Sequence, residues 1–216
     1  MSASTSPFAE LTANERGLRA IERLAEIFKI PSLPEGLRVL AASESGINDL
    51  YMNLNRQFQD GKLSQKTKLI IGLGVAAAAG CADMTVYFAQ AAQAAGRTRE
   101  ETIEAVAIAF VCGIYNGYYR FRSQVPADMR AVYEAFRAPF NANTFVKPAL
   151  PVAEMESICI AVSSANNCSK CVEGHMVKGK AEGLTDEQID EIIKCGAVAA
   201  AAARITSALS PAPASA

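Results

Sequence analysis

Residues 155–175 read MESICIAVSSANNCSKCVEGH, and the prediction of the fold starts from this stretch. Its first half is an apolar run typical of a buried helix, and Cys168 fits the start of a second helix. Cys171 and then His175 would lie on the same face of that helix, because residues three and four apart are helical neighbours. Two thiols and the only imidazole of the chain would share one stripe. The stretch therefore predicts two consecutive helices that present a cluster of reactive side chains.

Glu156 lies in the first of these helices, twelve residues before Cys168. A carboxylate at that place can reach the stripe from the neighbouring helix and orient His175 or receive its proton, directly or through a water. Glu156 can equally be a solvated surface charge, since helices carry such residues in many places. The residues alone leave both interpretations open.

The composition indicates an all-α protein. The chain of 216 residues suffices for one good-sized domain or two small ones. Half of the residues are apolar, many of them alanine, which is typical of closely packed helices. No Asn-Gly or Asp-Gly pair lies between alternating apolar residues, so hairpins are not indicated. A formal net charge of −1 gives no electrostatic case for binding nucleic acid or an anionic membrane.

The N-terminal residues lack a basic segment followed by an apolar run, so no secretory signal is predicted. The longest apolar stretches, residues 69–82 and 196–203, are shorter than the ~20 residues that a membrane span needs. We therefore expect a soluble, cytoplasmic protein. In that compartment six cysteines rarely form a structural disulfide framework. Four of them are expected to be isolated, small, buried residues in apolar helices, namely Cys81, Cys112, Cys159 and Cys195.

Helical periodicity, capping residues and prolines divide the chain into segments. The expected order begins with a flexible tail (residues 1–12), N-terminal helices (13–61) and a first repeat unit (64–137). An extended linker (138–150), a unit with the Cys-x-x-Cys pair (151–210) and a disordered tail (211–216) follow. Residues 13–210 are expected to form a single all-helical domain. Ser64 and Thr98 are the expected helix caps of the first unit, with Glu101 as the capping-box partner of Thr98.

The last part of the chain repeats the pattern of the middle part. Residues 95–101, AGRTREE, parallel residues 182–188, EGLTDEQ, at a shift of 87. The same shift sets three unreactive or isolated residues against the reactive ones: Cys81, Met84 and Phe88 against Cys168, Cys171 and His175. We infer a degenerate internal duplication of a helical unit, in which only the C-terminal copy has the reactive residues.

Two further predictions concern packing. The helix expected over residues 43–59 should bury five apolar side chains, Ile47, Leu50, Met52, Leu54 and Phe58. An aromatic run precedes the linker and consists of Tyr115, Tyr118, Tyr119 and Phe121. Core or subunit-interface packing is the preferred interpretation of this run, and contact with a substrate is the alternative.

The chemistry open to the Cys-x-x-Cys pair is that of a thiolate, because the thiolate is the nucleophile. A helix N-terminus favours negative charge at Cys168, His175 can accept a proton from Cys171, and Lys170 adds a nearby positive charge. Once one thiol is oxidised to a sulfenate, the other can condense with it to a disulfide, which an external dithiol can reduce.

Other uses of the same residues have to be weighed. Zinc would use Cys168, Cys171, His175 and Glu156, but structural zinc sites usually have four Cys or His ligands and no second pair is evident. A thioredoxin-like motif would need a βαβ context, which the sequence does not indicate. A lone histidine in an apolar helix is normally a satisfied core residue, and the spacing from Cys171 argues against that.

The motif Glu-x11-Cys-x2-Cys-x3-His, formed here by Glu156, Cys168, Cys171 and His175, resembles the active-site motif of the alkylhydroperoxidase AhpD family, within the carboxymuconolactone decarboxylase-like superfamily. The segment YYRFR before the linker and the alanine-rich last helix ending in SALSP are also similar to that family. The resemblance runs from about residue 64 to residue 210. It implies an all-α AhpD-like fold, peroxidase activity and homo-oligomers, often trimers.

The resemblance also implies roles for the residues. Glu156 and His175 would form a proton relay, Cys171 would be the thiol that it deprotonates, and Cys168 would complete the disulfide. No metal or other cofactor is implied, because reducing equivalents come from dihydrolipoamide on a lipoylated protein and can pass to a peroxiredoxin. Some members have a second histidine between the cysteines, where this chain has Lys170, and a lysine can still stabilise a thiolate.

The leading hypothesis is a thiol-dependent peroxidase that reduces hydroperoxides, alkyl hydroperoxides above all and hydrogen peroxide as a further substrate, through a Cys168–Cys171 dithiol/disulfide cycle. One alternative is a protein-disulfide reductase that acts on a partner protein. Another is a non-catalytic helical module that binds zinc or senses thiol oxidation. Neither nucleic acid nor a membrane is expected as a partner.

Overall fold

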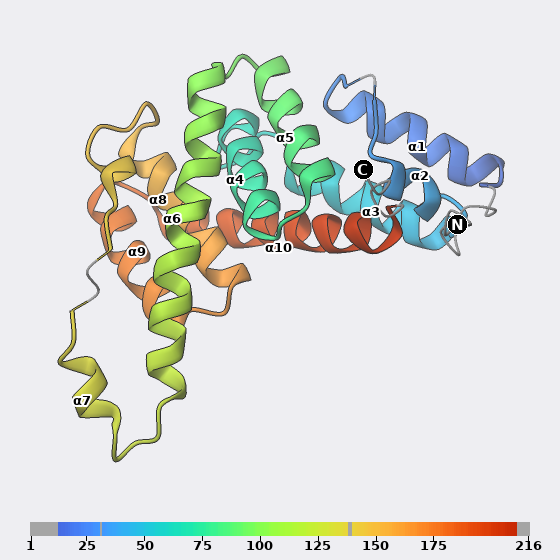
Figure 1. Ribbon diagram of the computed structural model, residues 1–216. Helices are drawn as coiled ribbons and strands as arrows, with labels where there is room; N and C mark the ends of the chain where they lie inside the picture. Colours follow the sequence, from blue (N-terminus) through green and yellow to red (C-terminus); the bar gives the residue numbers. More distant parts are fainter. Residues whose placement is uncertain (1–12, 31, 138–139, 211–216) are drawn as a thin grey trace, which may run out of the picture.

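All secondary structure in the part of the chain described by the computed structural model, residues 13–30, 32–137 and 140–210, is helical (Figure 1). Over these residues there are ten α-helices and one short 3-10 helix, and no strand. The all-α prediction is therefore confirmed. The tails expected at residues 1–12 and 211–216 lie outside the described residues.

Three N-terminal helices, α1 (Glu15–Ile27), α2 (Glu35–Leu40) and α3 (Glu44–Gln57), precede the repeated part. The side chains of Asn14 and Ser43 cap α1 and α3 by accepting a backbone N–H. The predicted apolar face of α3 is buried except at Met52, which is 59% exposed. That part of the prediction is wrong because Met52 lies about 140° around the helix from Ile47, away from the face that the other four residues share.

The internal duplication is visible in the helix bounds. The first unit consists of α4 (Gln65–Ala78), α5 (Ala82–Ala94) and α6 (Arg99–Gln124), and the second of α8 (Val152–Ala165), α9 (Ser169–Ala181) and α10 (Asp186–Leu209). A shift of 87 residues carries both ends of α4 onto those of α8, both ends of α5 onto those of α9, and the start of α6 onto the start of α10. Each long helix begins with a capping box, Thr98 with Glu101 and Thr185 with Gln188.

The turns inside the two units repeat as well. Gly96 and Gly183, related by the shift, end α5 and α9 with φ angles of 91° and 94°. Gly80 ends α4 with a φ of 71°, and its counterpart Asn167 ends α8 with a φ of 56°. Asparagine is one of the few residues other than glycine that adopts the left-handed region readily. The turn at Asn167 reverses the chain and delivers the next residue, Cys168, to the start of α9.

The core lies where the two units meet. α4 is buried over most of its length, and α10 packs against α2, α3, α4, α5 and α8 (Figure 1). By length and composition α10 would suffice to cross a membrane, and it is the one such helix in the described residues. Its inward residues, among them Ile192, Cys195, Ala199 and Ala203, are fully buried against the neighbouring helices. α10 therefore holds the N-terminal helices and both repeat units together.

The second half of α6 projects from the body of the molecule together with α7 (Arg130–Glu134), as Figure 1 shows. Tyr115 on this arm donates a hydrogen bond to the Phe140 carbonyl, 2.8 Å away. The segment predicted to be an extended linker is partly helical where it is described, since residues Asn143–Phe145 form the 3-10 helix η1. Glu104 fixes the end of this segment by accepting the N–H of Leu150 at 3.2 Å.

Candidate active site

Cys168 and Cys171 form a disulfide at the start of α9. Cys168 is the N-cap residue of the helix and Cys171 lies in its first turn, which brings their Cα atoms to 5.3 Å. This separation lies inside the range that a disulfide requires. Both cysteines are buried. The disulfide therefore closes within the first turn of α9.

Glu156 and His175 form a buried pair between α8 and α9. Glu156 Oε2 lies 2.7 Å from His175 Nδ1, and Glu156 is 5% exposed. A solvated surface charge, the other interpretation of Glu156, does not fit this burial. An ionised carboxylate accepts the Nδ1–H of the ring, which leaves Nε2 unprotonated in the neutral imidazole. The structure thus brings together the carboxylate and the imidazole that the sequence placed on two adjacent helices.

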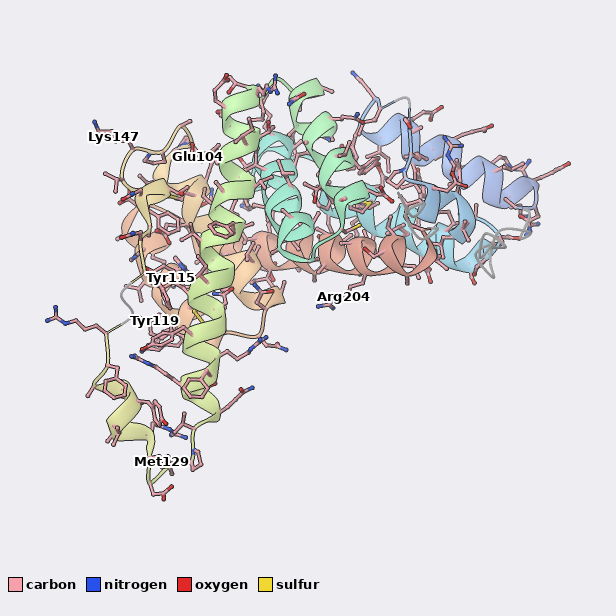
Figure 2. The ribbon with its side chains drawn as sticks, in the orientation of Figure 1. Glu104, Tyr115, Tyr119, Met129, Lys147 and Arg204 are labelled. Carbon is pink, nitrogen blue, oxygen red and sulfur yellow. A yellow bond between two sulfur atoms is a disulfide. The ribbon has the colours of Figure 1, made fainter. Side chains whose placement is uncertain are left out.

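A cavity of about 400 Å³ lies between α6 and α9, and Cys171 and His175 both line it. Tyr115 and Tyr119 form its wall on the side of α6 (Figure 2), with their rings stacked 6.4 Å apart. The preferred interpretation of the aromatic run was core or subunit-interface packing. Core packing does not describe these two residues, because they face the cavity and are only half-buried, and interface packing stays a prediction. Lys170, which was expected to add a positive charge, also lines the cavity and pairs with Glu173 at 3.1 Å.

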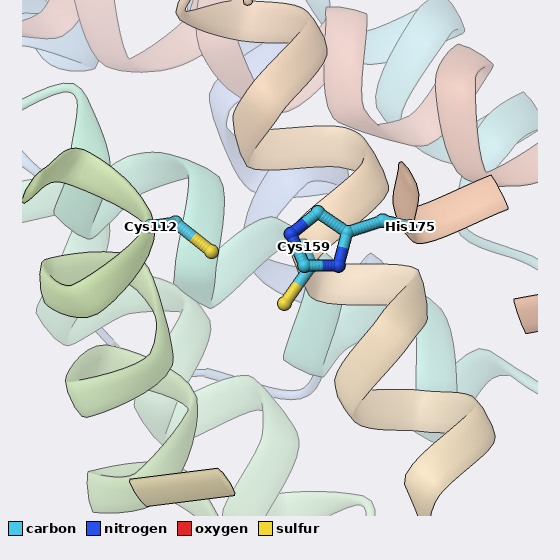
Figure 3. A group of neighbouring side chains, drawn as sticks. All are labelled: Cys112, Cys159 and His175. Carbon is cyan, nitrogen blue, oxygen red and sulfur yellow. The ribbon is translucent and has the colours of Figure 1, made fainter. Parts of the chain in front are cut away.

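Two further thiols lie behind this cavity. Cys112 on α6, Cys159 on α8 and His175 have their ligating atoms within 4.8 Å of one another (Figure 3). Both cysteines are buried, as predicted, but they are not isolated, because the packing of α6 on α8 brings them together. A hydrogen bond that the Cys159 thiol donates to Cys112, together with burial and the nearby charge of Glu156, raises the pKa of the Cys159 thiol well above its ordinary value.

The other two free cysteines behave as predicted. Cys81 and Cys195 are buried and unbridged. Burial raises the pKa of the Cys195 thiol to about 12, so this thiol stays protonated and unreactive at neutral pH.

A polar contact from α6, which was not predicted from the sequence, fixes the turn before Cys168. Asn116 is buried, and its side-chain amide donates to Ser163 Oγ at 3.0 Å and accepts from the Asn166 amide at 3.0 Å. Arg120 donates to the Asn166 carbonyl at 3.2 Å. The signal in the sequence was an asparagine within an otherwise apolar and aromatic helix, which has to satisfy its amide group once it is buried.

The zinc ligands considered in the sequence analysis do not come together as four donors. Cys168 and Cys171 are bonded to each other and offer no thiolate in this state. In the part of the chain that the structure describes, one group of three close ligating side chains remains, and its sulfur atoms belong to Cys112 and Cys159. Cys159 could have been found from the sequence, since it follows Glu156 by one helical turn. Cys112 could not, because only tertiary packing places it there.

The fold agrees with the comparisons to known proteins. The model of the carboxymuconolactone decarboxylase family matches residues 45–120 and 130–214, so that the first matched segment covers all but the last four residues of the first repeat unit and the second covers the second unit. The chain therefore belongs to the carboxymuconolactone decarboxylase family. The match begins at residue 45, earlier than the resemblance noted from the motifs.

Within this family, the chain is similar to proteins named alkyl hydroperoxide reductase AhpD. That of Anaeromyxobacter dehalogenans strain 2CP-1 is 35% identical over 156 residues, which are 72% of this chain and 81% of the relative. That of Methylocella silvestris is 30% identical over 155 residues, covering 72% and 85%. A solved structure from Burkholderia xenovorans LB400, described as a gamma-carboxymuconolactone decarboxylase subunit, superposes with a TM-score of 0.59 over 89% of this chain and 96% of that one. Its 17% identity shows the shared fold alone.

Proposed function

We propose that this protein is a thiol-dependent peroxidase that reduces alkyl hydroperoxides through a Cys168–Cys171 dithiol/disulfide cycle. The observation that supports it most is the position of the Cys-x-x-Cys pair, which lies at the start of a helix beside a buried carboxylate–imidazole pair and an aromatic-walled cavity. The similarity to relatives named AhpD points to the same activity.

In the proposed cycle Cys171 is the thiol that reacts with the peroxide. Its thiolate attacks one oxygen of the O–O bond, a sulfur–oxygen bond forms, and the alkoxide leaves and takes up a proton to become the alcohol. The Cys168 sulfur then attacks the sulfenic acid, a disulfide forms as the S–O bond breaks, and the hydroxide leaves as water with the proton of the Cys168 thiol. Two electrons from an external dithiol return the pair to the reduced state.

His175 takes up the proton that the Cys171 thiol loses in the first step. It lies one helical turn after Cys171 and lines the same cavity, so its Nε2 is the group that takes the thiol proton. Glu156 holds the opposite ring nitrogen and stabilises the imidazolium that forms. This arrangement follows the usual order of nucleophile, base and orienting group.

The cavity suits an organic hydroperoxide. Tyr115, Tyr119 and Phe145 supply apolar surface, which favours an alkyl chain over a charged substrate. Lys170 and Lys178 stand at its edge as positive charges that can stabilise an anionic thiolate or the leaving alkoxide.

The reductant is proposed to approach from another side. Cys168 does not line the aromatic cavity but a separate surface hollow, which Ser164, Val172 and Met176 also line. Attack of a dithiol on the Cys168 sulfur would release Cys171 as the thiolate, next to His175. The better-stabilised thiolate leaves faster. We propose dihydrolipoamide on a lipoylated protein as this dithiol, in a cytoplasmic setting, with a peroxiredoxin as a further acceptor.

Assembly with further copies of the chain is also proposed. The arm of α6 and α7 exposes four large apolar side chains, Phe121, Met129, Val132 and Phe136. Exposed apolar side chains that lie together are typical of surfaces that bind another protein. A second copy packed on this arm, in a trimer or a larger closed assembly, would cover them.

The experiment that tests the function is peroxide consumption with tert-butyl hydroperoxide, lipoamide, lipoamide dehydrogenase and NADH. Turnover is expected for the wild type and for Cys195→Ser, and it should be lost in Cys171→Ser. If the wild type shows no turnover but one equivalent of peroxide removes two titratable thiols, the chemistry stands and the donor is a different dithiol. If neither is seen, the proposal is wrong, and reduction of a disulfide-bonded protein substrate is the activity to measure next.

A further inference from the structure

Side chains from three helices bring two thiols and one imidazole close together at the wall of the cavity. Cys112 comes from α6, Cys159 from α8 and His175 from α9, and their ligating atoms all lie within 4.8 Å of one another. In Figure 3 the outer edge of the imidazole ring faces the two sulfur atoms. The cluster is almost fully buried, yet Cys112 and His175 form part of the cavity wall, so a small ion can reach it.

Glu156 prepares the imidazole for metal coordination. It takes the hydrogen bond of Nδ1 at 2.7 Å, which fixes the ring and leaves Nε2 directed toward the sulfur atoms. Metal-ligating histidines almost always donate their other ring N–H to such a partner, which sets the tautomer and raises the basicity of the ligating nitrogen. The cluster therefore has three donor atoms, and Glu156 holds one of the donor side chains, His175, in place.

The distances fit a tetrahedral ion. Zinc–sulfur and zinc–nitrogen bonds of ~2.3 and ~2.0–2.1 Å place the ligand atoms of a tetrahedral site about 3.5–3.8 Å apart. Atoms that already lie within 4.8 Å reach this arrangement with side-chain adjustments of about 1 Å. Three protein ligands leave a fourth position, and the neighbouring cavity supplies room there for a water or for the Cys171 thiolate.

The donor set determines which kind of ion fits the cluster. A divalent ion would displace two protons and leave two thiolates and a neutral imidazole around it, which is the soft donor set that zinc and similar ions prefer.

We propose that Cys112, Cys159 and His175 form a binding site for a thiophilic metal ion of the Zn²⁺ type, and that the bound ion inhibits the enzyme by occupying His175. The inhibition rests on the proposed function, since it removes the base that would take the proton of Cys171. The binding does not rest on it.

Binding is tested with Co²⁺ as a spectroscopic probe, on reduced protein under nitrogen. The Cys168→Ser/Cys171→Ser double variant serves as the background, so that the Cys-x-x-Cys pair cannot hold the ion. One equivalent of Co²⁺ should give a thiolate-to-cobalt charge-transfer band, and Zn²⁺ should abolish the band by displacing Co²⁺. Release of two protons per ion, measured in weak buffer, is the second readout.

Variants locate the site. Cys112→Ala, Cys159→Ala and His175→Gln should each weaken Co²⁺ binding by more than 100-fold, which exceeds the ~10–100-fold expected for the supporting change Glu156→Gln. Cys81→Ala and Cys195→Ala are matched controls, because each removes a buried free thiol that lies outside the cluster, and they should bind as the parent does. His175 is partly exposed, so its variant stays informative even if a buried cysteine variant fails to fold.

Two results would overturn the site. One is the lack of a charge-transfer band in the parent protein. The other is a band that survives both Cys112→Ala and Cys159→Ala, which would place the ion elsewhere. A Cys112–Cys159 disulfide found by peptide mapping after mild oxidation, together with no Co²⁺ binding by the reduced protein, would replace the metal site by a second redox pair.

The inhibition is measured as the ratio of peroxidase rates with and without a zinc chelator, at a fixed low concentration of Zn²⁺. The ratio should exceed 10 for the wild type and for Cys195→Ala, and approach 1 for Cys159→Ala. Equal ratios in wild type and Cys159→Ala would overturn the inhibition. Because the cobalt band needs no turnover, a failure of the proposed peroxidase activity and a failure of the metal site give different results.

Discussion

Lys68 Nζ on α4 lies 3.0 Å from Glu191 Oε2 on α10, and the lysine side chain is 4% exposed. Lys68 also donates to the Gln59 carbonyl at 2.8 Å. The two carboxylate oxygens of Glu191 accept the backbone N–H groups of Lys62 and Leu63, both at 2.9 Å. One ion pair therefore joins the first repeat unit, the last helix and the loop between α3 and α4.

Glu191→Gln is expected to lower the free energy of unfolding at pH 7 by about 2–3 kcal/mol, because it leaves the charge of Lys68 buried without its partner. Urea unfolding monitored by circular dichroism measures the change. Asp190→Asn is the matched control, since it removes an exposed pair with Lys194 and should shift stability by less than about 0.5 kcal/mol. Equal losses in the two variants would contradict the importance of the buried pair.

The same pair predicts a pH dependence. Burial raises the pKa of Glu191, but the two backbone N–H groups and Lys68 outweigh it, so that its pKa lies below the usual value. A carboxyl with a lower pKa in the folded state stabilises the fold above its unfolded pKa, and this contribution is lost as the pH falls through the folded pKa. The stability difference between wild type and Glu191→Gln should therefore shrink from pH 6 to pH 3. A constant difference over that range would show that the charge of Glu191 has no part in it.

The Glu156–His175 pair is expected to set the reactivity of Cys171. In a Cys168→Ser background, Glu156→Gln and His175→Gln should raise the pKa of the Cys171 thiol, so that its alkylation by iodoacetamide at pH 7 slows by about 10-fold. A pH series of alkylation rates measures this. Lys180→Gln, which removes an exposed pair with Asp186 near the other end of the same helix, should leave the series unchanged. Coincident series for all these proteins would rule out the relay.

Asn116 is expected to stabilise the turn that positions Cys168. Asn116→Ala removes one buried and one partly buried hydrogen bond and leaves the Ser163 hydroxyl and the Asn166 amide without their partner, at a cost of about 2–3 kcal/mol. Closure of the disulfide after addition of one equivalent of peroxide should also become slower. Asn53→Ala, an exposed change on α3, is the control and should stay within about 0.5 kcal/mol of the wild type. Unchanged closure kinetics would restrict Asn116 to a role in stability.

Two glycines in helices should respond to alanine with opposite signs. A Cβ at Gly74 would lie 2.6 Å from Ile158 Cγ2 in the core, so Gly74→Ala should cost about 1–3 kcal/mol. A Cβ at Gly113 meets nothing within 4 Å, so Gly113→Ala should stabilise α6 by about 0.5–1 kcal/mol. Thermal unfolding of the two variants measures both. A stabilising Gly74→Ala would show that α4 and α8 are less closely packed than the structure has them.

Local signals account for what the sequence predicted well. Ser64 and Thr98 cap their helices, as predicted, because a hydroxyl in that position satisfies a free N–H at the helix end, whatever lies further away. The repeat was found for the same reason, since its capping boxes and its turn glycines recur at a constant spacing.

Features that depend on how distant helices meet were missed. Cys112 lies 47 residues before Cys159, and no local pattern says that α6 and α8 cross at these two thiols. The aromatic cavity wall was equally ambiguous, because a tyrosine that packs in a core and one that lines a cavity follow the same helical period. The roles of Glu156, His175 and the two active-site cysteines remain predictions that the variants above test.

The two copies of the 87-residue repeat differ at the four positions of the proposed active site. In the first copy Leu69, Cys81, Met84 and Phe88 occupy the places that Glu156, Cys168, Cys171 and His175 occupy in the second. Phe88 is fully buried and stacks on Phe58 with ring centroids 5.2 Å apart. Apolar packing at these places in the first copy corresponds to the buried Glu156–His175 hydrogen bond in the second. The same arrangement of three helices therefore packs apolar side chains at these positions in one half of the chain and frames a buried polar pair in the other.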